Sequence, residues 1–184
     1  MAFIVVYDAN AMYGNTLRDL LIRIGRAGLV QAKGTEDILG EALGNLARNR
    51  PDITQKKLAR LRELINGAIR DCLITGYESL IEGLKLPDPR DRLVLAAAIK
   101  AGAQVIVTAN LKDFPAELLA PWNIEAKSPD DFVLDQISID DRTVFACIQA
   151  IADARNHPPE SMDDILGQLE RAGLVESAAT LRTN

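Results

Sequence analysis

The stretch that decides the fold is residues 87–114, PDPRDRLVLAAAIKAGAQVIVTANLKDF. Asp88 followed by Pro89 predicts a helix start, because Asp is a good N-cap and Pro suits the first helical position. The apolar segment that follows predicts a helix as far as Gly102, which can take the positive φ of a helix end. Residues 104–108 are a short apolar, β-branched run that predicts a strand covered on both faces. The stretch therefore predicts a helix, a tight turn and a buried strand.

Polar side chains stand at both ends of this unit. They are Asp88 and Asp91 at the start of the helix, and Thr108, Asn110 and Asp113 after the strand. If the helix runs antiparallel to its strand, both groups lie at the same edge of the sheet. In open parallel sheets, ligands bind outside the carboxyl ends of the strands. We therefore expect a functional site at this edge.

Strands alternate with helices as far as residue 127, which is typical of an α/β domain with a parallel sheet. Beyond the opening stretch, we expect strands at residues 3–7, 72–75 and 124–126. Apolar residues at helical spacing predict helices at residues 16–27, from Thr35 onward and at residues 54–70, and residues 77–84 are compatible with a further short helix. In the helix at residues 54–70, the inward positions are Leu58, Leu61, Leu64 and Ile65.

The last third of the chain predicts helices only. One helix begins after Ser128, where a cap, a proline and two acids follow each other. Others are expected from Ser138 with Asp141 as its capping partner, from Ser161 with Asp164, and over residues 175–181. We therefore divide the chain into an α/β domain at residues 1–135 and a helical C-terminal extension at residues 136–184.

Composition excludes several classes of protein. The longest apolar run, residues 93–99, is far too short to span a bilayer, and the first residues lack the basic segment of a signal peptide. Cys72 and Cys147 match no metal or redox spacing, so we expect free thiols in a reducing cytoplasm and no membrane association. The single His157 disfavours a zinc site or a His-based nucleophilic triad.

Charge is unevenly distributed along this acidic chain of net charge −5. Residues 18–70 hold eleven basic and six acidic residues, whereas the remainder holds ten basic and twenty acidic residues. This asymmetry permits a local basic surface, although a solvated helix with scattered charges explains it equally well.

Oxygen-bearing side chains from four separate elements form the candidate site: Asp8, Glu41, Asp91, and either Asn110 or Asp113. Such hard ligands, without His or Cys nearby, suit Mg²⁺ or Mn²⁺. Each residue also has a purely structural interpretation, because Asp8 can cap a turn, Glu41 can be an exposed acid, and Asp91 can cap a helix together with Asp88. Asn110 and Asp113 can likewise be ordinary turn residues.

Several short motifs occur together in a characteristic order. They are a hydrophobic strand ending in Asp8-x-Asn10, Ile38-Leu39-Gly40-Glu41, Asp88-x-x-Asp91-Arg92, the segment at residues 102–110, Leu111-Lys112-Asp113-Phe114, and the helix start at residues 128–132. With these motifs, residues 3–135 resemble the PIN domain, the nuclease fold of VapC-type toxins and related ribonucleases. The resemblance implies an α/β, PIN-like three-layer sandwich with a central parallel sheet of four or five strands, followed here by the helical extension.

The resemblance also implies roles for individual residues. Asp8, Glu41 and Asp91 match the acidic metal ligands of the family. Asn110 stands where many relatives have Asp, so it contributes a neutral oxygen or is replaced in that role by Asp113. Thr108 and Asn10 match polar positions beside the metal, and Asp88 matches a second acid before Asp91.

The activity that the resemblance implies is Mg²⁺- or Mn²⁺-dependent endoribonuclease cleavage of RNA by the toxin of a toxin–antitoxin pair. It further implies a small antitoxin partner and a homodimer. Two alternatives stay open. A strand ending in Asp8-Ala9-Asn10 is also similar to the nucleophile loop of haloacid-dehalogenase-like phosphatases, and the neutral Asn110 is compatible with a non-catalytic PIN module that binds RNA or protein.

Overall fold

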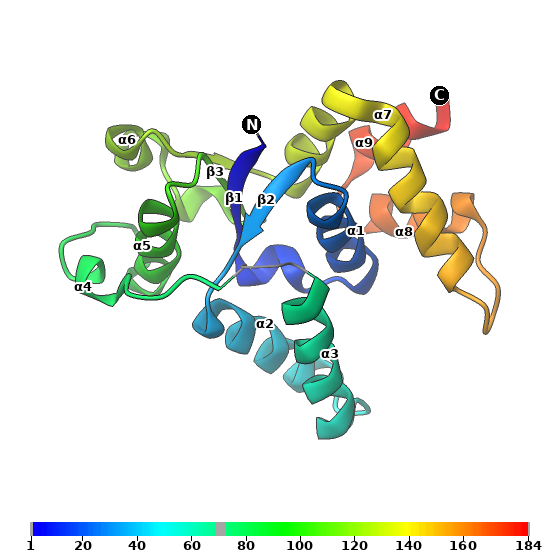
Figure 1. The fold of residues 1–184 in the computed structure, drawn as a ribbon, viewed down its shortest axis with the longest axis horizontal. Coiled ribbons are helices and arrows are strands. Elements are labelled where there is room, and N and C mark those ends of the chain that lie inside the picture. Colours follow the sequence, from blue (N-terminus) through cyan, green and yellow to red (C-terminus); the bar gives the residue numbers. More distant parts are fainter. Residues whose placement is uncertain (1, 69–72, 184) are drawn as a thin grey trace.

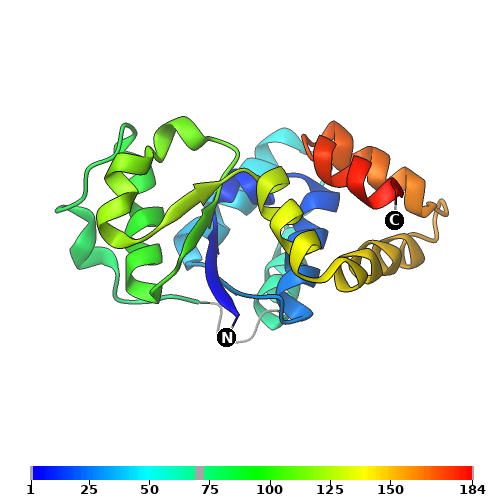
Figure 2. The same ribbon diagram turned by 90° about the horizontal axis from the view of Figure 1, so that it is seen from above.

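The computed structural model describes residues 2–68 and 73–183. Within these ranges the chain forms a four-stranded, all-parallel sheet with helices on both faces (Figures 1 and 2). The strand order is β2-β1-β3-β4, with β1 at Phe3–Tyr7, β2 at Val30–Lys33, β3 at Val105–Val107 and β4 at Glu125–Lys127. This architecture confirms the predicted α/β, PIN-like fold.

Strand β1 lies in the middle of the sheet. Val5 pairs with Ala32 of β2 on one side and with Val105 of β3 on the other. Val5 and Val6 are both fully buried, as expected for a parallel strand with helices on both faces. The backbone N–H of Asp8 still donates to the carbonyl of Val107 at 2.9 Å, so β1 and β3 end side by side.

Helices cover the two faces of the sheet in the way that the sequence predicts. Helix α5 (Arg92–Ala101) contacts β1 and β3 on one face, whereas α1 (Asn15–Arg26) and α7 (Pro129–Ala154) cover the other (Figure 1). The Asp88 side chain accepts from the backbone N–H of Arg90 at 2.9 Å and opens the short turn η2 (Pro89–Asp91) that leads into α5. Gly102 ends α5 with a φ of 64°.

Helices α2 (Glu36–Asn49) and α3 (Gln55–Ala68) pack against each other below the sheet in Figure 1. The Thr35 hydroxyl caps α2 by accepting from the N–H of Ile38 at 3.0 Å. Leu58 and Ile65 of α3 are buried as predicted. The prediction for Leu64 is wrong, because its side chain is 52% exposed.

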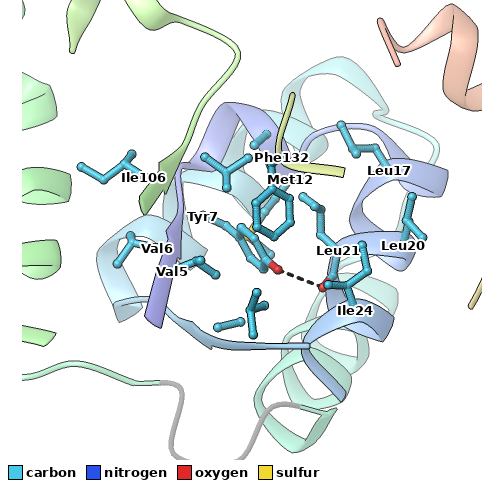
Figure 3. Packing of buried hydrophobic residues seen from close by; sticks show 14 of the residues in the cluster. Val5, Val6, Tyr7, Met12, Leu17, Leu20, Leu21, Ile24, Ile106 and Phe132 are labelled. Carbon is cyan, nitrogen blue, oxygen red and sulfur yellow. Dashed lines mark hydrogen bonds between the residues drawn. The ribbon is translucent and has the colours of Figure 1, made fainter. Parts of the chain in front are cut away.

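A small aromatic contact joins the sheet to α7 and α1. The rings of Tyr7 and Phe132 meet edge to face, with centroids 5.8 Å apart, and the Tyr7 hydroxyl donates to the Leu21 carbonyl at 3.1 Å (Figure 3). Burying an aromatic side chain of this size contributes roughly 1.5–3 kcal/mol. The start of α7 is therefore part of the central core.

The sequence analysis missed β2 and expected a strand at residues 72–75 instead. Cys72 lies outside the described residues, and Leu73 forms only an isolated parallel bridge with Gly34. Strand β2 is only four residues long, and its sequence VQAK alternates apolar and polar residues too briefly to give a clear pattern. The sheet therefore has its outer strand before α2, not after α3.

Helix α7 continues through the point where a new helix was expected at Ser138. Its backbone is kinked at Asp140, which has φ −156° and ψ 88°. The Asp140 carboxylate accepts from the Thr143 N–H at 3.0 Å and from the Thr143 hydroxyl at 2.7 Å, so Asp140 caps the second half of α7. The Ser138 hydroxyl instead donates back to the Leu134 carbonyl at 3.0 Å, so the predicted Ser138–Asp141 cap is wrong.

The last two helices form where the sequence predicts them. Ser161 and Asp164 form a capping box at the start of α8 (Met162–Arg171), and α9 (Val175–Thr183) follows. Both helices contact α7, and α8 also contacts α1. Short turns connect the remaining elements: α4 (Glu78–Ile81), η1 (Ala9–Met12), η3 (Leu111–Asp113), α6 (Ala116–Leu119) and η4 (Ala120–Trp122). In the described ranges, no helix has both the length and the hydropathy that crossing a bilayer requires.

Candidate active site

Asp8 lies directly after β1 at the carboxyl edge of the sheet and is 5% exposed. One carboxylate oxygen accepts from the Ala9 N–H at 2.7 Å and caps η1, and the other accepts from the Thr108 hydroxyl at 2.8 Å. Burial raises the pKa of Asp8 and the charge of Glu41 raises it further, whereas these two hydrogen bonds lower it. The residue is therefore both a turn cap and a buried acid at the predicted edge.

Thr108 connects the two loops that follow β1 and β3. Its fully buried hydroxyl accepts from the Asn10 side-chain amide at 3.2 Å and from the Asn110 N–H at 3.1 Å, besides donating to Asp8. The Asn10 side-chain carbonyl accepts from the Ala109 N–H at 2.9 Å. These contacts place Asn10 and Thr108 beside Asp8, where the sequence predicted polar neighbours.

Asp91 ends η2, immediately before α5, and is partly buried. Burial raises the pKa of Asp91, and negative charges nearby raise it further, to about 6; these charges belong to Asp8, Asp88, Asp113 and Glu41. The last of these, Glu41, is exposed on α2. The structure therefore brings the predicted acids from separate elements within electrostatic reach of Asp91.

Asp88 is paired with a cation that the sequence analysis did not single out. The Arg90 guanidinium donates to the Asp88 carboxylate at 2.7 Å, and this contact lowers the pKa of Asp88. The Arg90 side chain is 89% exposed. The sequence Asp88-Pro89-Arg90 could have indicated this pair, because the turn that begins at Asp88 brings the Arg90 side chain back to the Asp88 carboxylate.

Asn110 and Asp113 occupy the two ends of the turn η3. The Asn110 side-chain amide donates to the Asp113 carboxylate. Both residues are half-buried. Because the two side chains are in contact, the amide oxygen of Asn110 and the carboxylate of Asp113 lie close together. Which of them supplies the fourth metal-binding oxygen stays a prediction.

The donor chemistry of this edge fits a hard divalent cation. The candidate donors are all oxygens, which Mg²⁺ and Mn²⁺ prefer, and a cation would relieve the mutual repulsion that contributes to the raised pKa of Asp91. In the positions that the structure shows, no three Asp, Glu, His or Cys side chains of residues 2–68 and 73–183 are grouped closely enough to hold a metal ion. The carboxylates therefore share an electrostatic environment without forming a preassembled ligand cage.

An all-parallel sheet with acids from several elements at its carboxyl edge defines a PIN-like α/β protein. Residues 129–183 match the family model described as "VapC50 C-terminal domain". The chain is 44% identical, over 96 residues, to "Putative ribonuclease VapC50" from Mycobacterium tuberculosis. These findings confirm the resemblance to the VapC-like PIN-domain family.

The match to this relative covers 50% of the present chain, and the chain spans 56% of the relative's length. No solved structure matches the chain. The matched C-terminal family begins at residue 129, whereas the predicted extension begins at residue 136, and the predicted domain boundary stays a prediction.

Proposed function

We propose that this protein is a Mg²⁺- or Mn²⁺-dependent endoribonuclease and the toxin of a toxin–antitoxin pair. One observation carries the proposal: acids from separate elements act together on Asp91 at the carboxyl edge of the sheet. The name of the Mycobacterium tuberculosis relative supports ribonuclease as the class of activity. We also propose a small antitoxin partner and a homodimer, which rest on the family resemblance. We propose a cytoplasmic location because Cys147 is a free thiol.

In this proposal, Asp8 and Asp91 supply the first metal-binding oxygens. Glu41 and either Asn110 or Asp113 complete the site or orient the attacking water. A bound Mg²⁺ or Mn²⁺ lowers the pKa of water and neutralises charge on a phosphoryl oxygen. Thr108 keeps one oxygen of Asp8 in a fixed direction through its 2.8 Å hydrogen bond. No protein nucleophile is required, which agrees with the single histidine in the sequence.

RNA binding is assigned to the outer face of α3. Lys56, Lys57 and Arg60 are exposed there, near the start of the helix. Phosphate contacts release counterions, so affinity for single-stranded RNA should fall with salt with a slope of about −0.7 per phosphate contacted. Replacing the three residues by Gln should lower both the affinity and this slope, and unchanged values would contradict the assignment.

The central experiment compares Asp8→Asn with Asp153→Asn, a matched change of an exposed acid near the end of α7. Cleavage of a labelled RNA is followed with Mg²⁺, with Mn²⁺ and after chelation with EDTA. We expect cleavage by the wild type and by Asp153→Asn only with metal, and none by a folded Asp8→Asn variant. RNA binding without cleavage in the wild type, or cleavage that survives chelation, would overturn the proposed activity.

A further inference from the structure

A cavity of about 620 Å³ lies between the sheet and the part of α7 that precedes the kink. The first residues of all four strands line it: Phe3, Val30, Val105 and Glu125. We call it the amino-edge cavity, because Asp8 and the candidate active site lie at the other edge of the sheet. Val5 and Phe132 line its inner wall and are at most 1% exposed. This size and these mostly apolar walls are typical of sites for small organic molecules.

The sheet gives the amino-edge cavity an apolar side and a charged side. Val105 of β3 pairs with Val5 of β1 on one side and with Glu125 of β4 on the other. Paired residues of neighbouring strands point to the same face of a sheet, and so do residues two apart along a strand. This face is therefore apolar over β1 and β3, and it carries Glu125 and Lys127 over β4. A ligand that fills the cavity contacts both kinds of surface.

The charged side has more negative than positive charge. The Lys127 ammonium donates to the Asp135 carboxylate of α7, and a Glu125 carboxylate oxygen lies 3.7 Å from the same ammonium. Among the described residues that line the cavity, one basic side chain therefore faces two acids, a net charge of −1. The Asp135 side chain is 45% exposed, so a ligand can approach it. A positively charged group is favoured here over a negatively charged one.

Gln136 of α7 supplies an unused hydrogen-bond acceptor. It lines the cavity and is only 4% exposed. Within residues 2–68 and 73–183, its side-chain oxygen has no hydrogen-bond partner. Most buried polar atoms in folded proteins do have a partner, and leaving one unpaired is costly. An N–H group that enters the cavity would remove this cost, and it would do so beside the acidic side.

We propose that the amino-edge cavity binds a small organic amine. Its apolar body packs on Val5, Phe132 and Ile139, its N–H donates to Gln136, and its positive charge lies beside Asp135. A carboxylate would meet the net negative charge, and a purely apolar molecule would leave Gln136 without a partner. The inference goes beyond the nuclease activity, because none of these residues belongs to the candidate active site.

The test measures the binding of matched probes to the full-length protein in EDTA, by titration followed in amide NMR spectra. Phenyl, naphthyl, cyclohexyl and butyl bodies are each used as a primary amine, an alcohol and a carboxylate. We expect the amines to shift the amides of β1, β4 and residues 129–139. They should bind at least about tenfold more tightly than the carboxylates with the same body, with the alcohols between them. No amine binding at these amides, or equal binding of the carboxylates, would overturn the proposal.

Two variants separate the hydrogen bond from the charge. Gln136→Leu removes the acceptor and should weaken amines and alcohols alike, at least about fivefold, because both donate to it. Asp135→Asn removes a negative charge and should reduce the affinity of each amine to that of its alcohol. Gln149→Leu and Asp153→Asn are the matched controls on the same helix, since both residues are exposed and absent from the cavity lining. The same spectra show whether each variant is folded.

A variant of an exposed residue keeps the test decisive if Gln136→Leu does not fold. Ile139 is 58% exposed and lines the cavity, so Ile139→Lys should weaken the amines and strengthen the carboxylates. Val175→Lys, at an exposed residue outside the lining, should change neither. Unchanged amine binding in folded Gln136→Leu or in Ile139→Lys would contradict the proposal. Shifts of the same amides on dilution without a probe would show that a second copy of the chain covers the cavity, and would overturn it.

The outcome of this test is separate from that of the nuclease assay, because the titration contains neither metal nor RNA. A protein that binds the amines and cleaves no RNA would support the amino-edge cavity and contradict the proposed nuclease. The reverse result would contradict only the cavity.

Discussion

At the scale of single residues, Thr108 has the largest number of roles in the candidate site. Its hydroxyl donates to Asp8 and accepts from the side chain of Asn10 and the backbone of Asn110. It is fully buried, so water cannot replace these contacts if the hydroxyl is lost. A loss of this hydroxyl leaves several polar groups without partners.

Thr108→Val should therefore destabilise the protein by about 2 kcal/mol, because the shape is kept and the hydrogen bonds are lost. The Asp8 carboxylate loses its fixed direction, so nuclease activity should fall more than RNA binding does. Urea unfolding and RNA cleavage measure the two effects. Thr108→Ser is the control, because it keeps the hydroxyl and should retain most of the activity; equal losses in both variants would contradict the assigned role.

The raised pKa of Asp91 predicts how the stability of the protein depends on pH. Burial and neighbouring acids raise its pKa from 3.8 to about 6 in the folded protein, so the folded state holds a proton that the unfolded state releases between these values. The contribution of Asp91 to the free energy of unfolding therefore falls as pH rises from about 4 to about 6. Above about pH 6 this contribution stays constant and destabilising. The full shift would be worth about 3 kcal/mol, and screening of this partly exposed group reduces it to about 1 kcal/mol.

In metal-free buffer, Asp91→Asn should accordingly be more stable than the wild type by about 1 kcal/mol at pH 7. The gain should shrink as pH falls through the range from 6 to 4 and disappear below it. Urea unfolding at several pH values in EDTA measures the difference. A gain that is independent of pH would show that the neighbouring charges are not its cause.

At the scale of elements, α7 depends on a cap in its interior. Asp140 leaves helical geometry and accepts two hydrogen bonds from Thr143, which also lower the pKa of its carboxyl group. The kink changes the direction of α7 at Asp140, and α7 as a whole contacts both α8 and α9. The Asp140 side chain thus caps the part of α7 that follows the kink.

Asp140→Ala should lower the urea midpoint of unfolding, because the second half of α7 loses its N-cap. The stabilising effect of Asp140 should also be lost at low pH, since protonation of a carboxyl group with a lowered pKa weakens its acceptor role. Asp141→Ala is the matched control, because Asp141 is exposed and was wrongly expected to form the cap. A larger loss in Asp141→Ala than in Asp140→Ala would contradict this interpretation of the kink.

At the scale of the whole molecule, hydrogen bonds from Asp130 and Thr16 help to hold the C-terminal helices to the rest of the chain. The Asp130 carboxylate accepts from the backbone N–H groups of Glu176 and Ser177, at 3.0 and 2.9 Å, and so caps α9 from the start of α7. The Thr16 hydroxyl of α1 donates to Gln168 of α8 at 2.5 Å. The extension is therefore bound to the core by specific hydrogen bonds as well as by apolar packing.

Asp130→Ala should remove the cap of α9 and cost about 1–2 kcal/mol of stability. Amide hydrogen exchange should show the loss of protection concentrated in α9, with β1 and β3 unchanged. Asp153→Ala, an exposed acid with a single Gln149 contact, is the control and should leave α9 protected. Uniform loss of protection across the chain would instead show that α9 and the sheet unfold as one unit.

The sequence by itself determined the central helix, turn and strand of the fold, because their signals are local. Asp88 and Gly102 mark helix ends through backbone chemistry that needs no distant partner. The position of Asp8 at the end of a buried strand likewise follows from hydrophobic pattern. The chemistry of an oxygen-rich site at the carboxyl edge of a parallel sheet could be predicted for the same reason.

Only the tertiary structure decided the features that depend on contacts between distant segments. Strand β2 is too short to be recognised alone and is defined by pairing with β1. Leu64 has an apolar pattern that predicts burial, but the neighbouring helices leave it exposed on a groove. Burial in the fold raises the pKa of Asp91 and lowers that of Arg18, and charges from distant parts of the chain add to both shifts: Asp8 and Glu41 act on Asp91, and Arg155 acts on Arg18. The free energy of a charge depends on what surrounds it in three dimensions.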